Sequence, residues 1–350
     1  MEHDDCTALV TLTRADIIES IHYGAFTLVD RQGNLVASQG NPETLTYPRS
    51  SMKPLQVIPF IENKGHKKFK LTLEETAIMC ASHHGTDAHV AVLKSMHQKI
   101  GIDLSHLKCG VHWPTDKATA DAMRTRAEEP NSYRHNCSGK HTGMLAFAKM
   151  QQLSLDDYLE NGHPIQKEIY RAVGEMCDMA TDTMPIGVDG CSAPVFGIPL
   201  RNFALGIARL CQPQDLAPSR ARACKHIAKA MYSFPIMVAG PNAFDTVLMQ
   251  TMQGKLICKG GAEGYQAVGI LPGAFGKGSP ALGLAIKISD GDLTRRAVTC
   301  VAIEILNALG LFSTDQYQAL RQFGRKPLQN WRGIEIGEMN VTFELPKFSW

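Results

Sequence analysis

The amino-acid sequence predicts an α+β fold (α/β in the broad sense) in which a mostly antiparallel sheet is covered by helices. Strand signals lie at both ends of the chain and helix signals fill its middle, without the alternation typical of repeated βαβ units. With 350 residues, of which 44% are hydrophobic, the chain is long enough to bury a full core. We therefore expect a folded globular protein.

The expected sheet begins at the N-terminus, where apolar and β-branched residues dominate segments 8–14, 22–30 and 34–40. Turn residues at 31–34 predict a hairpin between the second and third of these strands. Strand signals return near the C-terminus, separated by glycine-rich turns, in segments 255–260, 265–273, 281–289 and 334–345. We expect the early and late strands to share one sheet.

The middle of the chain has helical periodicity. After Tyr47-Pro48 the apolar residues recur at helical intervals, and Pro54 suits only the first turn, so Ser50 and Lys53 should lie at a helix start. Further helices are predicted over 73–82, 86–99, 117–127, 140–150, 164–179, 215–232 and 292–310.

The domain organisation follows from this distribution. We interpret residues 1–350 as a single catalytic domain with two lobes, one formed by the sheet (7–40 and 254–345) and one by the helical middle (48–250). Polar, proline-containing segments at 128–132 and 211–219 are interpreted as loops at which a lobe boundary could fall.

Charge and cysteine content exclude several classes of protein. The net charge is +2 and no five like charges follow one another, so neither nucleic acid nor a membrane surface is indicated as a partner. The N-terminus MEHDDCTALV has acids where a secretory signal has basic residues, and the apolar stretch 297–312 is too short to span a bilayer. We expect a cytoplasmic protein whose ten cysteines are thiols.

Two short motifs suggest serine chemistry. In Ser50-Ser51-Met52-Lys53, positions i and i+3 face the same way at a helix start, so the lysine amine could reach the Ser50 hydroxyl and deprotonate it. Downstream, the segment CASHHG holds Ser82 in a polar turn between two predicted helices. Each has a simpler interpretation, as a helix-capping serine beside a solvated lysine or as a capping turn.

Two glycine-rich loops each contain a cysteine. The segment HNCSGKHTG places Cys137 and Lys140 before an apolar helix, and GVDGCSAP places Cys191 in a second polar loop. The two cysteines could share a metal, although a cysteine in such a chain is more often a buried core thiol.

The late segment KGGAEG places Lys259 at the edge of a predicted strand. It is similar to the Lys-Thr-Gly strand of serine β-lactamases and penicillin-binding proteins, and the order of the three motifs is the same. Two departures are that Gly260 stands where threonine would be, and that Ser82 follows the first motif too closely.

Taken together, the segments RSSMKP, CASHHG, HNCSGKHTGML, GVDGCSAP and KGGAEG resemble, in this order, the L-asparaginase II family, the Rhizobium-type thermolabile asparaginases. The resemblance spans about positions 7 to 310. It implies a fold similar to serine β-lactamases and glutaminases, hydrolysis of L-asparagine to L-aspartate and ammonia, a zinc ion near the substrate, and a homodimer.

The resemblance also implies roles for individual residues of this chain. It pairs Ser50 with Lys53 and Ser82 with Lys259 as catalytic groups, and leaves open which serine attacks. Carried over in the same way, the zinc ligands are Cys137, Lys140 and Cys191, and the candidate substrate-binding residues are Arg49, His141 and Asp189.

Two other functions stay open at this stage. One is another serine amidohydrolase of the β-lactamase-like group, such as a glutaminase, which a panel of substrates would distinguish. The other is a non-catalytic metal-binding protein, which would release no ammonia from asparagine.

Overall fold

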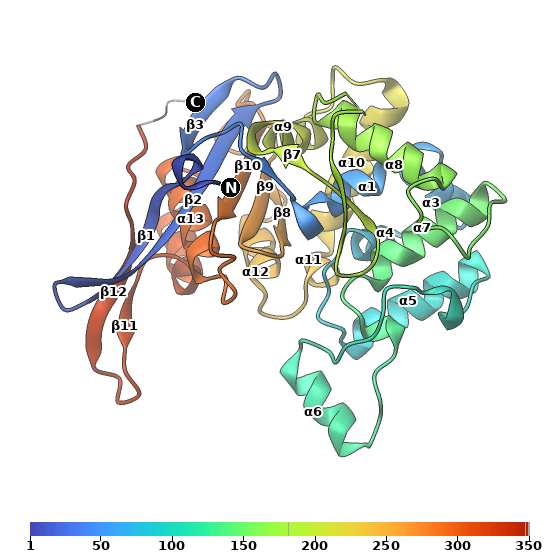
Figure 1. Cartoon of the computed structure of the whole chain (residues 1–350), viewed down its shortest axis with the longest axis horizontal. Helices are drawn as coiled ribbons and strands as arrows, with labels where there is room; N and C mark the ends of the chain where they lie inside the picture. The colour runs from blue at the N-terminus through green and yellow to red at the C-terminus, as the bar shows by residue number, and fades with distance from the viewer. Residues whose placement is uncertain (181, 347, 349–350) are drawn as a thin grey trace.

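The computed structural model describes residues 1–180, 182–346 and 348, and it places a twisted sheet beside a group of helices (Figure 1). The strands come from both ends of the chain and most of the helices from its middle. The α+β fold predicted from the sequence is confirmed, including the sharing of one sheet by early and late strands.

The main sheet joins eight strands of the described part of the chain, in the order β11-β12-β1-β2-β10-β9-β8, with β3 also paired to β2. Every pairing in it is antiparallel. Its strands are β1 (Thr7–Arg14), β2 (Ile17–Asp30), β3 (Leu35–Gln39), β8 (Leu256–Gly261), β9 (Tyr265–Ile270), β10 (Leu282–Ile288), β11 (Lys326–Gln329) and β12 (Glu335–Val341).

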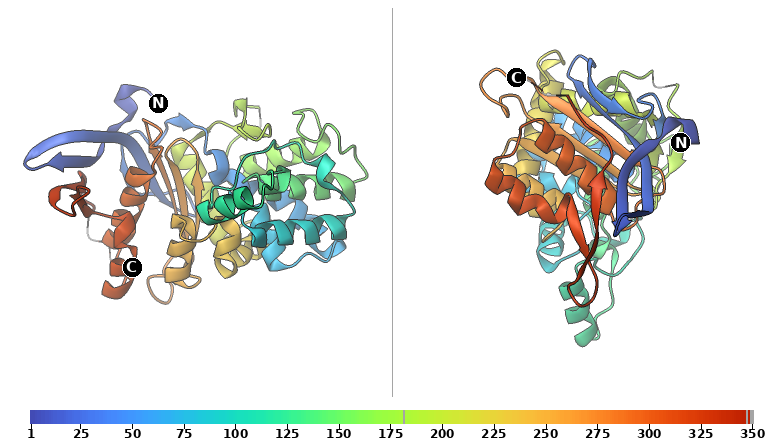
Figure 2. Two further views of the ribbon diagram at one scale, coloured as in Figure 1. Left: turned by 90° about the horizontal axis from the view of Figure 1, so that it is seen from below. Right: turned by 90° about the vertical axis from the view of Figure 1, so that its left-hand side faces the viewer.

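The centre of this sheet is buried along β9 and β10. Two helices pack on these strands, α9 (Leu200–Cys211) and α13 (Arg296–Ala308). Such continuous burial is expected where a sheet is covered on both faces, in contrast to the alternation of a half-solvated sheet. Figure 2 shows the same layers from two further directions.

Most of the remaining helices form the second part of the molecule, on the side of β8, and a few lie beside the sheet. The longer ones are α4 (Leu73–Met79), α5 (Asp87–Ile100), α6 (Lys117–Thr125), α7 (Ser138–Met150), α8 (Pro164–Met176), α10 (Pro218–Ser233), α12 (Phe244–Met252) and α14 (Thr314–Leu320). The shorter ones are α1 (Lys53–Gln56), α2 (Ile58–Glu62), α3 (Gly65–Lys68), α11 (Pro235–Val238), and the 3-10 turns η1 (His3–Asp5), η2 (Arg49–Met52), η3 (Leu104–His106), η4 (Ser132–Arg134) and η5 (Arg321–Phe323).

The predicted helices are all present with shifted ends, whereas α9, α12 and α14 were not predicted. Within the described residues, no helix is long and apolar enough to cross a bilayer.

Two small antiparallel pairs position loops at the junction of sheet and helices. Strand β4 (Leu45–Thr46) pairs with β7 (Ile198–Pro199), and β5 (Ile186–Val188) pairs with β6 (Pro194–Phe196). The connection between β5 and β6 is a tight turn that contains Asp189 and Cys191. It is closed by a hydrogen bond from the Asp189 amide to the Ala193 carbonyl at 2.9 Å.

Candidate active site

The site lies where β8, the edge strand of the main sheet, meets the turn η2. The Ser51 hydroxyl donates a hydrogen bond to the Lys259 carbonyl at 2.8 Å. Next along β8, a Cβ atom added at Gly261 would lie 2.4 Å from the Pro48 carbonyl oxygen. Only glycine fits there, because a side chain would push the turn away from the strand.

Ser82 is fixed by the backbone of its loop. After α4 ends, the Ser82 amide donates to the Val238 carbonyl at 3.0 Å, and the His84 amide donates to the Ala239 carbonyl at 2.7 Å. The loop is therefore tied on both sides of the serine before α5 begins at a capping box. A loop held in this way presents its hydroxyl in a defined direction.

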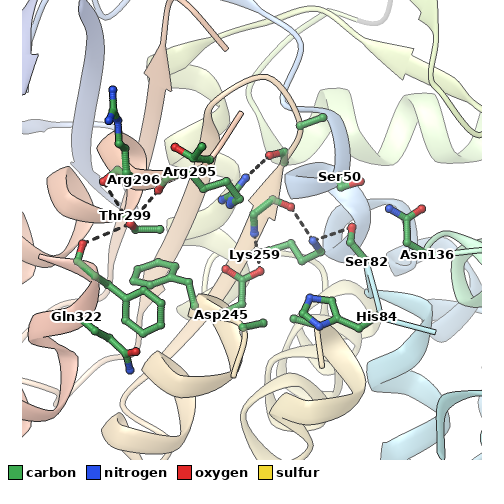
Figure 3. Close-up of a pocket in the computed structure, with 18 of the residues that line it drawn as sticks. Ser50, Ser82, His84, Asn136, Asp245, Lys259, Arg295, Arg296, Thr299 and Gln322 are labelled. Atoms are coloured by element: carbon green, nitrogen blue, oxygen red, sulfur yellow. Dashed lines mark hydrogen bonds between the residues drawn. The ribbon is translucent and has the colours of Figure 1, made fainter. Parts of the chain in front are cut away.

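The Ser82 hydroxyl lies between two lysine amines. Its Oγ is 3.0 Å from Lys53 Nζ and also 3.0 Å from Lys259 Nζ. Figure 3 shows the contact with Lys259. Lys53 has an exposed fraction of 0% and Lys259 of 2%, so both amines are shielded from bulk water. The predicted contact between Ser82 and Lys259 is formed, although the two residues are 177 positions apart in the sequence.

The expected contact between Ser50 and Lys53 is not formed. Lys53 Nζ instead donates to the Ala81 carbonyl at 2.5 Å, to Ser82 and to Cys137 Sγ at 3.2 Å, and no described hydrogen bond joins it to Ser50. Lys53, the first residue of α1, is completely buried and its amine turns inward to the loop after α4, whereas Ser50, in the 3-10 turn over Arg49–Met52, is only partly buried. Ser50 lines the same cavity as Ser82.

Lys259 has the altered basicity expected of a general base. Burial lowers its pKa to about 7, Lys53 and Arg295 lower it as well, and Asp245 and Cys137 act in the opposite direction. A large fraction of the amine is therefore neutral near neutral pH, and a neutral amine can accept a proton from Ser82.

Asp245 is a buried carboxylate in the first turn of α12 that the sequence analysis did not single out. It accepts hydrogen bonds from the Gly260 amide at 2.7 Å and from the Gln266 side chain at 3.1 Å. Burial raises its pKa, but Lys259 and Arg295 outweigh burial and hold it below the usual value. The only sequence signal was a lone acid in the otherwise apolar helix FDTVLMQTM, and nothing local links that helix to β8.

The two predicted cysteine loops come together next to Lys53. Cys137 precedes α7, Lys140 lies in the first turn of that helix, and Cys191 lies in the turn between β5 and β6. Lys140 Nζ is 3.1 Å from Cys191 Sγ and 3.7 Å from an Asp189 oxygen. Arg49 Nε forms an ion pair with the other Asp189 oxygen at 2.7 Å.

The charges of this cluster favour a thiolate. A hydrogen bond with Cys137 and the charge of Lys140 lower the pKa of Cys191 to about 5, against the effect of burial. Burial lowers the pKa of the Lys140 amine, but the neighbouring Cys191, Cys137 and Asp189 outweigh burial. The pKa of Lys140 is therefore raised. Burial also opposes ionisation of Asp189, but Lys140 and Arg49 lower its pKa to about 2.

The predicted zinc ligands fit a zinc ion by their chemistry. The two buried thiol sulfurs are donor atoms that zinc accepts, and the adjacent Lys140 amine would be a third donor only in its neutral form, with water to complete the set. Within the described residues, no group of three or more His, Cys, Asp or Glu side chains could hold a metal ion, and the set Cys137, Lys140 and Cys191 contains only two residues of these types, both cysteines.

His141 lies behind this cluster. It is completely buried, and its Nδ1 is 2.6 Å from the Tyr158 hydroxyl. Burial, with the nearby charge of Lys140, lowers its pKa to about 3, so the ring is neutral. Its Nε2 has no hydrogen-bond partner in the described part of the chain, which leaves a buried polar atom available to a bound group.

A cavity of about 560 Å³ opens over Ser82 and Lys259. In Figure 3 its labelled residues extend from Ser50, Ser82 and Asn136, past Lys259 and Asp245, to Thr299 and Gln322. His84 and Asn136 line it as well, and both come from segments that the sequence had marked as unusual.

Comparison with known proteins identifies the family of the chain. The family model described as L-asparaginase II matches residues 10–341, nearly the whole chain, and so extends past the region in which the resemblance was seen. A search of curated proteins finds no match. The paired lysines around Ser82 and the adjoining cluster of cysteines thus lie in a chain that belongs to the L-asparaginase II family.

Proposed function

We propose that this protein hydrolyses L-asparagine to L-aspartate and ammonia, with Ser82 as the nucleophile and Lys259 as its general base. The observation that supports this most strongly is the position of the Ser82 hydroxyl, 3.0 Å from each of two buried lysine amines. Membership of the L-asparaginase II family supports the choice of substrate.

The reaction proceeds in two steps. Neutral Lys259 takes the hydroxyl proton as Ser82 Oγ forms a bond to the side-chain carbonyl carbon of asparagine. The same lysine then returns the proton to the amide nitrogen as the C–N bond breaks, and ammonia leaves. Water, deprotonated by the again neutral lysine, attacks the acyl-serine, and the lysine gives this proton to Ser82 Oγ as the acyl–oxygen bond breaks and aspartate leaves.

Other groups of the site bind and orient the substrate. The Ser50 hydroxyl and Asn136 amide line the cavity and would donate to the oxygen that becomes negative, while Lys53 holds the Ser82 hydroxyl in place. In this proposal Asp189, which pairs with Arg49 and Lys140 in the structure, binds the substrate's α-amino group, with Arg49 and His141 as candidates for the adjacent wall. Ser50 keeps the catalytic role expected from the sequence as part of this proposal, in contact with the substrate.

We assign zinc to Cys137, Lys140 and Cys191 as part of the same proposal. When bound, the ion would act as a weak Lewis acid that orients the polar end of the substrate, since two thiolates reduce its positive charge. The reaction above is written with the residues of the chain alone.

Zinc content gives a direct test of this site. Purified protein is expected to contain about one zinc per chain, and Cys137→Ala or Cys191→Ala should lower that content because each removes a ligand. Elemental analysis measures it, with Cys300→Ala as a control at a buried cysteine of α13. Full zinc occupancy in both ligand variants would reject the assignment.

An assay of ammonia release tests the function itself. The protein is expected to release ammonia from L-asparagine faster than from L-glutamine, and none from L-aspartate, which has no amide. Preference for glutamine would favour a related glutaminase. Absence of ammonia from both amides would favour the non-catalytic metal-binding alternative. A cytoplasmic location and a homodimer remain part of the proposal.

A further inference from the structure

The cavity over Ser82 is much larger than asparagine requires. Its volume of about 560 Å³ lies within the range of roughly 300 to 1,000 Å³ typical of pockets for drug-sized ligands. Asparagine is a small amino acid, and ammonia, its leaving group, needs almost no space. A large part of the cavity is thus left for something else.

The unused space lies beyond Lys259, on the side away from the cysteine cluster. We call it the extension and define it by its lining residues Ala243, Phe244, Thr299, Gln322, Phe323 and Lys326. In Figure 3, Thr299 and Gln322 lie across Asp245 from Ser82. The extension begins where Lys259 would protonate the leaving nitrogen.

The extension has an apolar wall. The rings of Phe244 and Phe323 meet edge to face, with their centres 5.1 Å apart. Beside them, the small side chain of Ala243 precedes α12 and is only partly buried. An aromatic pair next to a small residue can accept an aliphatic or aromatic side chain of a ligand.

The charged groups around the extension favour an anion. Lys326 Nζ donates to the Gln322 carbonyl at 3.0 Å and keeps further N–H groups for a ligand. The one acidic side chain that lines the cavity within the described residues, Asp245, is bound to the Gly260 amide and to Gln266. Arg296 points away (Figure 3) and donates to His22 at 3.0 Å.

We propose that the extension binds the leaving group of asparagine derivatives substituted on the side-chain nitrogen, namely β-aspartyl dipeptides with an apolar second residue. This rests on the proposed function, because the aspartyl part occupies the asparagine site. The apolar side chain of the second residue contacts Phe244 and Phe323, and its carboxylate faces Lys326.

The chemistry needs no additional reactant. Ser82 Oγ bonds to the β-carbonyl carbon, and the bond from that carbon to the dipeptide nitrogen breaks. The proton that Lys259 took from the serine goes to this nitrogen, so the second residue leaves as a free amino acid. Water then releases aspartate from the serine.

The first test compares β-aspartyl-leucine with asparagine, by release of leucine and of ammonia. We expect kcat/KM for the dipeptide to be at least a tenth of that for asparagine. If kcat/KM for the dipeptide is lower than this while asparagine is hydrolysed, the inference about the extension is wrong and the proposed function stands. Leucine release without ammonia release would overturn the asparagine assignment alone, and inactivity on both substrates would overturn both.

Two variants then locate the binding site. Ala243→Trp fills the extension and should lower the ratio of dipeptide to asparagine kcat/KM at least tenfold, whereas Ala308→Trp, on the exposed end of α13, should leave it unchanged. An equal loss of kcat/KM for both substrates would contradict the proposal that the extension binds the second residue of the dipeptide.

Lys326→Met tests the expected anion contact. The parent should prefer β-aspartyl-leucine over its C-terminal amide by about two- to fivefold, the range for an exposed ion pair, and the variant should lose this preference. A preference that persists in the variant would contradict the contact.

Discussion

Replacement of Ser82 by alanine is expected to lower kcat for asparagine by roughly 10⁴-fold or more, the scale seen when a serine nucleophile is removed. The hydroxyl is the group that both lysines contact, so no neighbouring side chain can replace it without moving. The fold should be preserved, because the loop is held by backbone hydrogen bonds on either side of this residue. Steady-state ammonia release and circular dichroism measure the two effects.

Ser50→Ala is the matched comparison, since Ser50 is a second serine in the same cavity. We expect it to retain measurably more activity than Ser82→Ala. Mass spectrometry of the acid-quenched parent reaction should find any aspartyl adduct on the peptide that contains Ser82. If the adduct is on Ser50 and the Ser82→Ala variant is still active, Ser50 is the nucleophile and Ser82 is not.

Lys259→Arg is expected to lower kcat by about a hundredfold or more, the usual contribution of general acid–base catalysis. Arginine keeps the positive charge and about the same length, but its guanidinium stays protonated and cannot take the serine proton. In the parent, activity should rise as pH increases through about 7, because the base must be neutral and the pKa of Lys259 is about 7. Activity near that of the parent, with the same pH profile, would exclude Lys259 as the base.

Asp245→Asn tests the effect of a neighbouring carboxylate on the pKa of Lys259. The Asp245 carboxylate raises the pKa of Lys259, whereas Lys53, which also contacts Ser82, and Arg295 at the start of α13 lower it. Removing the carboxylate charge should therefore lower this pKa further and move the acid limb of the kcat profile to lower pH. A merely structural role for Asp245 would lower activity without moving this limb.

The sequence was most informative where a motif stays within one loop. Ser82, Cys137, Lys140 and Cys191 lie in short polar segments that the structure brings together around Lys53. Glycines and polar residues in such segments indicate functional loops, because these residues contribute little to core packing. Their spacing identified the loops, whereas the contacts between them depend on the fold.

The pairing of serines with lysines was harder to predict. An i,i+3 rule assigns Lys53 to Ser50, but the buried Lys53 amine has its partners in the loop after α4, which no local rule includes. Asp245 was missed for a similar reason, because its contact with the Gly260 amide joins α12 to β8 and leaves no local pattern.

The position of Lys259 on an edge strand has a consequence for synthesis of the protein. Ser82 and Lys53 leave the ribosome early, while Lys259 follows 177 residues after Ser82 and is placed only when β8 has paired with β9. Strand β9 in turn depends on β10, which pairs with the N-terminal β2. Pairings so distant in sequence form late. In a nascent chain Ser82 therefore lacks its contact with Lys259 until β8, β9 and β10 have joined β2, whereas β11 and β12, at the other edge of the sheet, are not required for this contact.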